Sequence, residues 1–278
     1  MSLGSLRSIR AMLMRGLPAL LALCSAALLS ACATPPPVAL RSELAPTGTL
    51  RAAINYGNSI RAVKDPATGE PRGVSVDLSR ELARRLGVPV ELITFSAAGK
   101  VVEAVKAAQV DIGFVAIDPE RGADMLQTPP YVIIEGAYLV RKDSPIQSNA
   151  EVDRGGNRIA VGNASAYDLY LKRELKAATL VRAESSPVVT DLFLAQGLEV
   201  TAGVRQQLQA DAKRLPGLRL LDGRFMVIQQ AMALPKGRAA GARYLAQFIE
   251  EMKSSGFVAA ALARHGIEGA AVAPPAKF

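Results

Sequence analysis

The chain has 278 residues, a formal net charge of +8 and an aromatic content of 5%. Its basic residues are scattered, which argues against a nucleic-acid groove, because such a groove needs clustered cations and stacking rings. With two cysteines and one histidine, His265, the chain has too few ligands for a Cys/His metal site and hardly any material for a Ser-His-Asp triad. We expect no metal, no cofactor and no nucleic-acid partner, and a modest positive charge suits an anionic ligand.

The N-terminus has the layout of a targeting segment, and we predict a lipoprotein signal peptide at residues 1–31. Three arginines precede a short apolar run at residues 17–29. The sequence Leu-Ser-Ala-Cys that ends at Cys32 resembles a bacterial lipobox, whose cysteine is lipidated after cleavage; the alternative is an ordinary secretory signal with a chance cysteine. Lipidation would place the protein in the periplasm and tether it to the membrane by the lipid alone.

The next segment, residues 32–47, is rich in proline and alanine and shows no helical period, so we predict a linker. The folded part is expected to start at Gly48 and to end at Gly269. Residues 270–278 are expected to form a flexible tail. A folded part of about 220 residues is long enough for one large or two small domains.

Strand and helix patterns alternate along the folded part, which predicts an α/β fold with a mostly parallel sheet and helices on its faces. Asp77 suits the N-cap of a helix that ends at Gly87. Two long extended stretches are expected to cross between two lobes. The predicted elements are strands at 50–54, 90–94, 112–117 and 158–161, helices at 78–86, 100–108, 188–195, 238–253 and 256–265 and one starting at Ser165, and extended stretches at 132–141 and 225–234.

The segment from Asp111 to Tyr131 is the most informative about function. An apolar run at 112–117 predicts a buried strand, which Pro119 interrupts, and Arg121 follows just beyond the strand's C-terminal end. In open α/β sheets ligands bind at that end of the strands. A guanidinium there can hold a carboxylate through two parallel hydrogen bonds. The alternative is a solvated loop arginine.

Several motifs, taken in order and spacing, resemble one known family over nearly all of the predicted mature chain. They are GTLRAAINYG, Gly-x-x-x-Asp at 73–77, the segment ending in Pro130-Tyr131, RIAVGNASAYDLYL, LAQGLEVTAG and SGFVAAALARHGI. The chain resembles the type-two periplasmic solute-binding proteins of ABC importers, family 3, in the branch of the amino-acid binders. The resemblance implies two Rossmann-like lobes, at 48–135 plus 230–269 and at 136–229, joined by two hinge strands and closing over a ligand.

The resemblance also implies two residues that bind the ligand's carboxylate. The arginine of the first lobe falls on Arg121, and the hydroxyl of the second lobe falls on Ser165. A helix that starts at Ser165 would present free N–H groups and its positive dipole end to an anion. Ser165 is equally well suited to be a plain N-cap, and both roles are compatible.

Three other family positions depart from the amino-acid-binding pattern. The serine that assists the carboxylate falls on Ala116, the aromatic that packs on the ligand falls near Ala98, and the aspartate that holds the ammonium falls on Val204, beside Arg205. A buried ammonium without a carboxylate partner is strongly disfavoured. The hypothesis is therefore a small anionic solute, a dicarboxylate or an aromatic acid, with Arg205 as an additional cation.

Four further residues are expected to line the ligand cleft: Asp118, Tyr56, Asn58 and Asn163. Each of them is also an ordinary polar residue of a loop or a strand end, so neither interpretation is excluded.

The predicted function is binding rather than catalysis: a monomeric receptor that delivers its solute to an ABC permease of the inner membrane. The alternative is a periplasmic enzyme on the same scaffold, similar to the cyclohexadienyl dehydratases. Asp118 and Glu135 are the only acid–base candidates for that alternative, and neither has a visible partner in the sequence. A domain read by a signalling partner is a third possibility.

Overall fold

The computed structural model describes residues 38–277 of the chain. The predicted signal peptide at 1–31 and the predicted lipidation site Cys32 lie outside the described residues. No helix in the described part is both long and apolar enough to cross a membrane.

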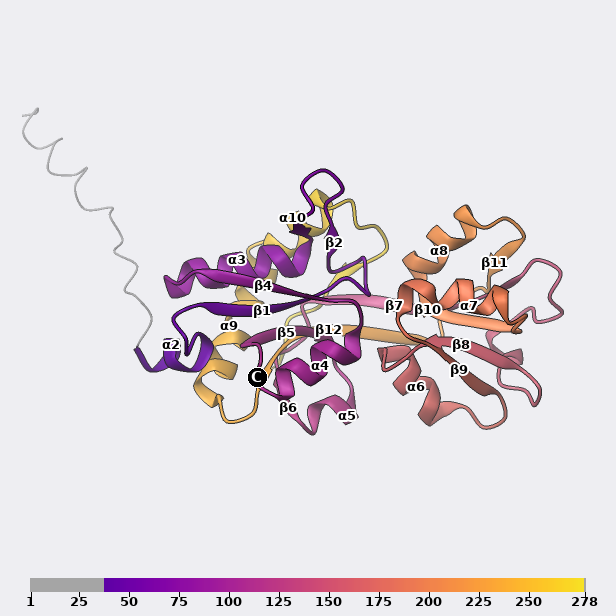
Figure 1. The fold of residues 1–278 in the computed structure, drawn as a ribbon, viewed down its shortest axis with the longest axis horizontal. Helices are drawn as coiled ribbons and strands as arrows, with labels where there is room; N and C mark the ends of the chain where they lie inside the picture. The colour runs from indigo at the N-terminus through magenta and orange to yellow at the C-terminus, as the bar shows by residue number, and fades with distance from the viewer. Residues whose placement is uncertain (1–37, 278) are drawn as a thin grey trace, which may run out of the picture. The chain divides into compact units, whose positions relative to one another are not determined.

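The main sheet is mixed, and its central path of strands explains the predicted two-part architecture (Figure 1). The order is β4 (Val90–Phe95), β1 (Leu50–Asn55), β5 (Ile112–Ala116), β12 (Met226–Pro235), β7 (Val132–Arg141), β10 (Val200–Val204), β8 (Arg158–Gly162) and β9 (Thr179–Ala183). The outer pairs are parallel, and β12 and β7 pair antiparallel with each other and with their neighbours. The α/β prediction is confirmed.

Short strands complete the sheet at its middle. Off the central path, β6 (Met125–Gln127) pairs with β12, and β11 (Leu218–Leu220) and β13 (Ala271–Val272) pair with β7. A separate hairpin consists of β2 (Val63–Lys64) and β3 (Pro71–Arg72).

The two long strands β7 and β12 are the elements common to both halves of the sheet. β12 pairs with β5 through Gln230–Ala233 and with β7 through Met226–Gln230, and β7 then pairs with β10 through Gly136–Leu139. The extended stretches predicted at 132–141 and 225–234 are therefore confirmed as strands. The lobe boundaries at residues 135 and 230 stay a prediction.

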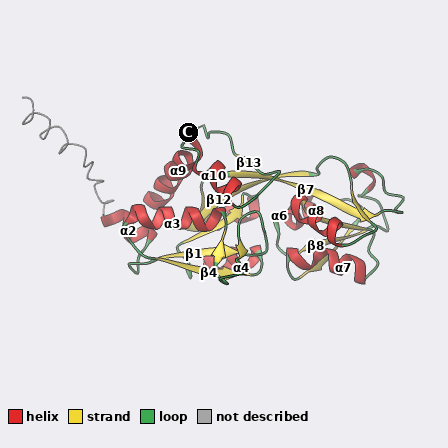
Figure 2. Ribbon diagram, turned by 90° about the horizontal axis from the view of Figure 1, so that it is seen from above, coloured by secondary structure: helices red, strands yellow, loops and turns green. Residues whose placement is uncertain are grey.

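Helices flank the sheet on both faces (Figure 2). They are α2 (Val38–Leu44), α3 (Val74–Leu86), α4 (Ala98–Lys106), α5 (Pro119–Gly122), α6 (Ala166–Glu174), α7 (Val189–Ala195), α8 (Arg205–Arg214), α9 (Ala239–Ser254) and α10 (Phe257–Arg264), with 3₁₀ turns at Asn149–Glu151 and Ser186–Val188. β1 shows why both faces are apolar: Leu50, Ala52 and Ile54 join one core cluster with α3, and Ala53 joins another with α4. A strand covered on both faces reads as a continuous apolar run.

The start of α3 differs from the prediction. The helix begins at Val74 with Gly73 as its N-cap, so Asp77 lies in the first turn. The physical reason is a close approach, because a Cβ at Gly73 would lie only 2.3 Å from the carbonyl oxygen of Arg61, and Gly73 has a φ of 139°. Asp77 instead accepts a hydrogen bond from Arg264 at 2.8 Å and contacts His265 Nε2 at 2.9 Å.

Both terminal predictions are wrong in part. The predicted linker at 32–47 contains α2, whose Leu44 is fully buried and whose Glu43 accepts a hydrogen bond at 2.7 Å from the backbone N–H of Gly241 in α9. The predicted tail at 270–278 contains β13, which adds to β7. Short segments of this kind gain their order from tertiary packing, which a local pattern of a few residues does not reveal.

An ion-pair network between α3 and α9 predicts how the fold responds to acid. Glu81 accepts hydrogen bonds from Arg84 and Arg85, each at 2.8 Å, and Arg85 also pairs with Glu251 at 2.6 Å. The hydrogen bond from Arg84, followed by that from Arg85, lowers the pKa of Glu81 from 4.5 to about 2. A lowered carboxyl pKa contributes stability above pH 4.5, and the contribution is lost as pH falls towards 2.

Glu81→Gln should therefore lower the free energy of unfolding at pH 7 by about 1 kcal/mol, a value that allows for solvent screening of a partly exposed pair. The difference from the parent protein should shrink below pH 4.5 and vanish near pH 2. Urea unfolding across this pH range measures it. Glu103→Gln is the matched control, since Glu103 is exposed and forms no ion pair in the described part of the chain; a loss independent of pH would contradict the account.

Candidate functional site

A small cavity of about 30 Å³ lies where the two halves of the sheet meet. Its lining comes from the carboxyl ends of β1, β5 and β10, the first residues of α4 and α6, and the middle of β12. This is the edge at which open α/β sheets bind ligands. The volume suffices for about one or two water molecules, and a hydrogen bond and an ion pair beside it join the two halves in a closed arrangement.

Arg121 reaches this cavity from the short helix α5. Pro119 occupies the first turn of that helix and Asp118 caps it, accepting a hydrogen bond from Glu120 N at 2.9 Å. Arg121 is 4% exposed. It donates from Nη1 to the Ala116 carbonyl at 3.3 Å and from Nη2 to the Ala164 carbonyl at 2.7 Å, and its buried Nε has no partner. Burial, reinforced by the nearby cation Arg61, lowers the pKa of Arg121 to about 10.

Ser165 lies on the opposite half, where its predicted role as an N-cap is confirmed. Its Oγ accepts a hydrogen bond at 3.0 Å from the N–H of Asp168, and Asp168 in return accepts one at 2.9 Å from the N–H of Ala164. Ala164 has a φ of 53°, in the left-handed region that alanine seldom adopts. The reciprocal bonds hold this turn in place, so the Ala164 carbonyl and the start of α6 face Arg121.

Arg61 is a cavity residue that the sequence did not single out. It follows β1, lines the same cavity and is 4% exposed. Its Nη1 donates to the Phe114 carbonyl, and its buried Nε has no partner. Burial lowers its pKa. A signal was present in the sequence, because Arg61 stands between Ile60 and Ala62, both apolar and both buried, where a solvated loop would be polar.

No acidic residue lines the cavity among the described residues. Ala98, Ala116 and Val204 do line it, so the three positions at which the chain departs from the amino-acid-binding pattern lie beside Arg121 and Ser165. A ligand ammonium in this cavity would meet no carboxylate there.

Of the other predicted site residues, only Asn58 lines the cavity. Tyr56 and Asn163 are not among the residues that line it, and Asn163 is exposed. The buried carboxylate of Asp118 forms an ion pair with Arg173 of α6, with an Nη2–Oδ2 distance of 2.9 Å. Asp118 therefore joins the two halves through an ion pair instead of lining the cavity.

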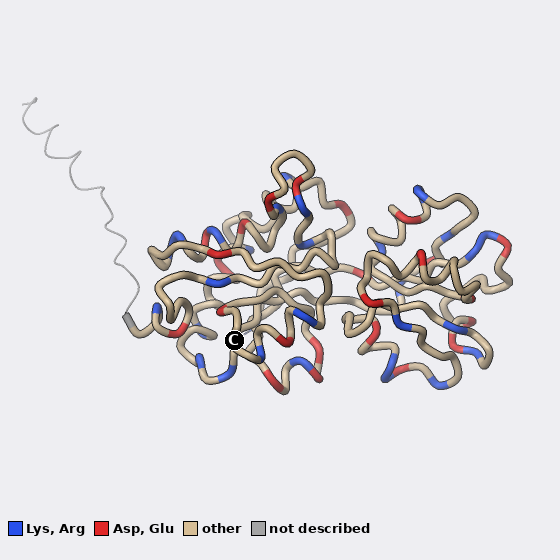
Figure 3. Tube along the Cα trace, viewed as in Figure 1, with Lys and Arg blue, Asp and Glu red and all other residues tan. Residues whose placement is uncertain are grey.

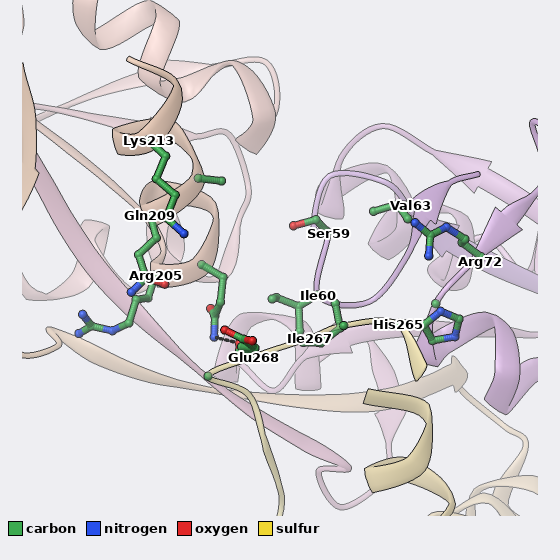
Figure 4. Close-up of a pocket in the computed structure, with 15 residues that line it drawn as sticks. Ser59, Ile60, Val63, Arg72, Arg205, Gln209, Lys213, His265, Ile267 and Glu268 are labelled. Carbon is green, nitrogen blue, oxygen red and sulfur yellow. Dashed lines mark hydrogen bonds between the residues drawn. The ribbon is translucent and has the colours of Figure 1, made fainter. Parts of the chain in front are cut away.

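Arg205 is also placed elsewhere. It donates from Nε to Glu135 at 2.9 Å and lines a wider pocket of about 510 Å³ (Figure 4). That pocket lies between α8, the β2–β3 hairpin and the loop that follows α10. Its cations are paired or partly exposed: Arg205 and Arg72 keep 22% and 43% of their side-chain surfaces exposed. Arg205 is not an additional cation of the small cavity, because its guanidinium forms an ion pair with Glu135.

Charges elsewhere in the described part are interspersed along the trace (Figure 3). Among residues 38–277, no group of three or more His, Cys, Asp or Glu side chains is arranged to hold a metal ion. The two buried guanidinium groups therefore stand out as the electrostatic feature of the site.

The family model for bacterial extracellular solute-binding proteins, family 3, matches residues 60–267, which include Arg61, Arg121 and Ser165. The chain belongs to this family. Among curated members of the solute-binding proteins, the glutamine-binding protein of Geobacillus stearothermophilus is 26% identical over 184 residues, which are 64% of this chain and 69% of that protein.

Solved structures of solute-binding proteins match the fold. A solute receptor for L-cysteine of Neisseria gonorrhoeae matches with a TM-score of 0.71 and 22% identity, over 83% of this chain and 94% of that one. An ancestral amino acid-binding protein, a precursor of cyclohexadienyl dehydratase, matches with a TM-score of 0.68 and 22% identity, over 80% of this chain and 97% of that one. These matches confirm the predicted periplasmic-binding-protein fold.

Replacing the buried cation Arg121 should stabilise the ligand-free protein. Arg121→Met keeps the length of the side chain and removes a buried charge without a counter-ion, so the free energy of unfolding should rise by about 1–2 kcal/mol. Urea unfolding of the ligand-free protein measures it, with Arg80→Met, which changes an exposed arginine of α3, as the control. A loss of stability larger than that of the control would show that the two carbonyl hydrogen bonds outweigh the cost of burial.

Proposed function

We propose that this solute-binding protein captures a small carboxylate-bearing solute between its two halves and delivers it to an ABC permease. The observation that carries the proposal is the buried, unpaired Arg121, which lies opposite the N-terminus of α6. In the described part of the chain Arg121 forms no salt bridge, and a carboxylate ligand would supply the missing charge.

The donors around the cavity suit a carboxylate. Two nitrogens of Arg121 are held by backbone carbonyls in the closed form, and these weak neutral acceptors can be exchanged for two carboxylate oxygens. Ser165 and the first N–H groups of α6 approach from the other half. A ligand that contacts both halves binds the closed form more tightly than the open form. This difference in affinity shifts the protein to the closed form and is the basis of capture.

The ligand we propose is an organic acid without an α-ammonium group. Two similar proteins are described as binding glutamine and L-cysteine, both α-amino acids. Val204 stands at the position that the resemblance assigns to the ammonium-binding aspartate, and no acid lines the cavity among the described residues. An ammonium buried there would lose its hydration and gain no counter-ion.

We further propose that the protein is a monomeric periplasmic lipoprotein anchored through Cys32. If so, α2 places the folded part close to the membrane, because α2 packs on α9 and only residues 33–37 separate it from the anchor.

The enzymatic alternative finds less support in the site. Both acid–base candidates are engaged in ion pairs: Asp118 with Arg173, and Glu135 with Arg205 and Arg224. The hydrogen bond from Arg224 lowers the pKa of Glu135, which keeps this carboxylate ionised and makes it a poor general acid.

Calorimetry with matched ligand pairs tests the proposed function. The lipid-free chain from residue 33 onward is titrated with amino acids and with the acids that lack their amino group, such as glutamate and glutarate, or phenylalanine and 3-phenylpropanoate. At least one deaminated acid should bind more than ~10-fold more tightly than its amino acid, a difference of about 1.4 kcal/mol. Arg121→Met should abolish that binding. Tight binding of free α-amino acids alone would contradict the proposal.

A further inference from the structure

Arg61 brings a second buried guanidinium to the cavity, and its anchoring point is set by the sheet. β1 pairs with β5 only as far as Gly113, so the carbonyls of Phe114 and Ala116 continue along the same edge of β5 without a strand partner. Arg61 binds the first of these carbonyls and Arg121 binds the second. Because alternate carbonyls of a strand point the same way, the two anchoring points lie about 7 Å apart.

The position of Arg61 is fixed by its backbone as well. Its carbonyl accepts hydrogen bonds from the N–H of Ser75 at 3.2 Å and from Ser75 Oγ at 3.0 Å. Gly73 packs against the same carbonyl. The backbone of Arg61 is therefore held by the start of α3, so its side chain starts from a fixed point beside the cavity.

Neither guanidinium has a counter-ion in the described part of the chain. The other titratable side chain beside Arg61 is Tyr131, whose buried hydroxyl has no hydrogen-bond partner. Burial raises the pKa of Tyr131, so it stays neutral at pH 7. Two like charges in one closed cavity repel each other and are poorly solvated, a state that persists only where something offsets it.

We propose that Arg61 and Arg121 form two cationic subsites of one cleft, which selects a small dicarboxylate over a monocarboxylate. This inference rests on the proposed function, since Arg121 and Ser165 would hold one carboxylate and Arg61 the other. If the two guanidinium groups keep the spacing of their carbonyl anchors, about 7 Å, a dicarboxylate of about four to six carbons can reach both. Each charge of such a ligand finds its own buried partner, and the cavity as a whole becomes neutral.

The test compares ligands that differ only in the second charge. Succinate, glutarate and adipate are titrated by calorimetry into the lipid-free chain from residue 33 onward, beside butanoate, pentanoate and hexanoate. At least one dicarboxylate should bind about 100-fold more tightly than the monocarboxylate of the same length. Equal affinities within every pair, or no binding by any of the three dicarboxylates, overturn the inference.

Arg61→Met provides the decisive readout. It should weaken binding of the preferred dicarboxylate about 100-fold and leave the affinity for the monocarboxylate of the same length unchanged. The substitution and the loss of the ligand's second carboxylate each remove the same interaction, so their effects are not additive. A purely structural role for Arg61 would weaken both ligands alike and would overturn the inference. Arg72→Met, which changes a partly exposed arginine outside the cavity, is the control and should change neither affinity.

The outcomes separate this inference from the proposed function. Binding of monocarboxylates and dicarboxylates with equal affinity, lost in Arg121→Met but retained in Arg61→Met, keeps the carboxylate receptor and overturns the second subsite. Thermal unfolding confirms that each variant is folded, and if Arg61→Met does not fold, the six ligands on the unaltered protein decide the question alone.

Discussion

One electrostatic imbalance governs the candidate site: two buried arginines share a cavity that no acidic residue lines in the described part of the chain. A protein interior tolerates a charge when a partner neutralises it, and here the direct contacts are backbone carbonyls and a neutral phenol. Asp118 and Glu120 act on Arg121 only through space, and Asp118 is already paired with Arg173. The cost of this arrangement is offset by the surrounding fold. An anionic solute would remove that cost on binding, so the same imbalance that weakens the empty protein favours the closed, loaded state.

The sheet places the two arginines where a ligand can contact both halves. β7 and β12 belong to both halves, and the cavity lies between the halves where their partner strands end. Arg121 already bridges the halves through the Ala164 carbonyl, and Asp118 bridges them through Arg173. These contacts hold the closed form without a ligand, but neither neutralises Arg121, since one is a hydrogen bond to a neutral carbonyl and the other is the partly exposed ion pair of Asp118 with Arg173. A ligand gripped from both sides would hold it more firmly.

Much of the fold could be predicted from the sequence, because its long elements carry strong local signals. β7 follows from an uninterrupted extended stretch rich in β-branched residues, and the start of α6 follows from Ser165 and Asp168, which are three residues apart. The formation of α2 and β13 could not be predicted, since α2 is stabilised by packing on α9 and β13 by pairing with β7. Arg121 and Ser165 were identified by resemblance to the family. Arg61 was not singled out, and the pairing of Arg205 with Glu135 was not foreseen, because a sequence does not reveal which arginine the fold buries and which it pairs with an acid.

The most direct test of the two-arginine site is a crystal structure of the lipid-free protein with glutarate. We expect one carboxylate to bind Arg121 and the first turn of α6, and the other to bind Arg61. The Arg61 guanidinium would then leave the Phe114 carbonyl or bind both. A ligand that contacts Arg121 alone while Arg61 keeps its present bond, or a ligand in the wider pocket beside Arg205, would contradict it.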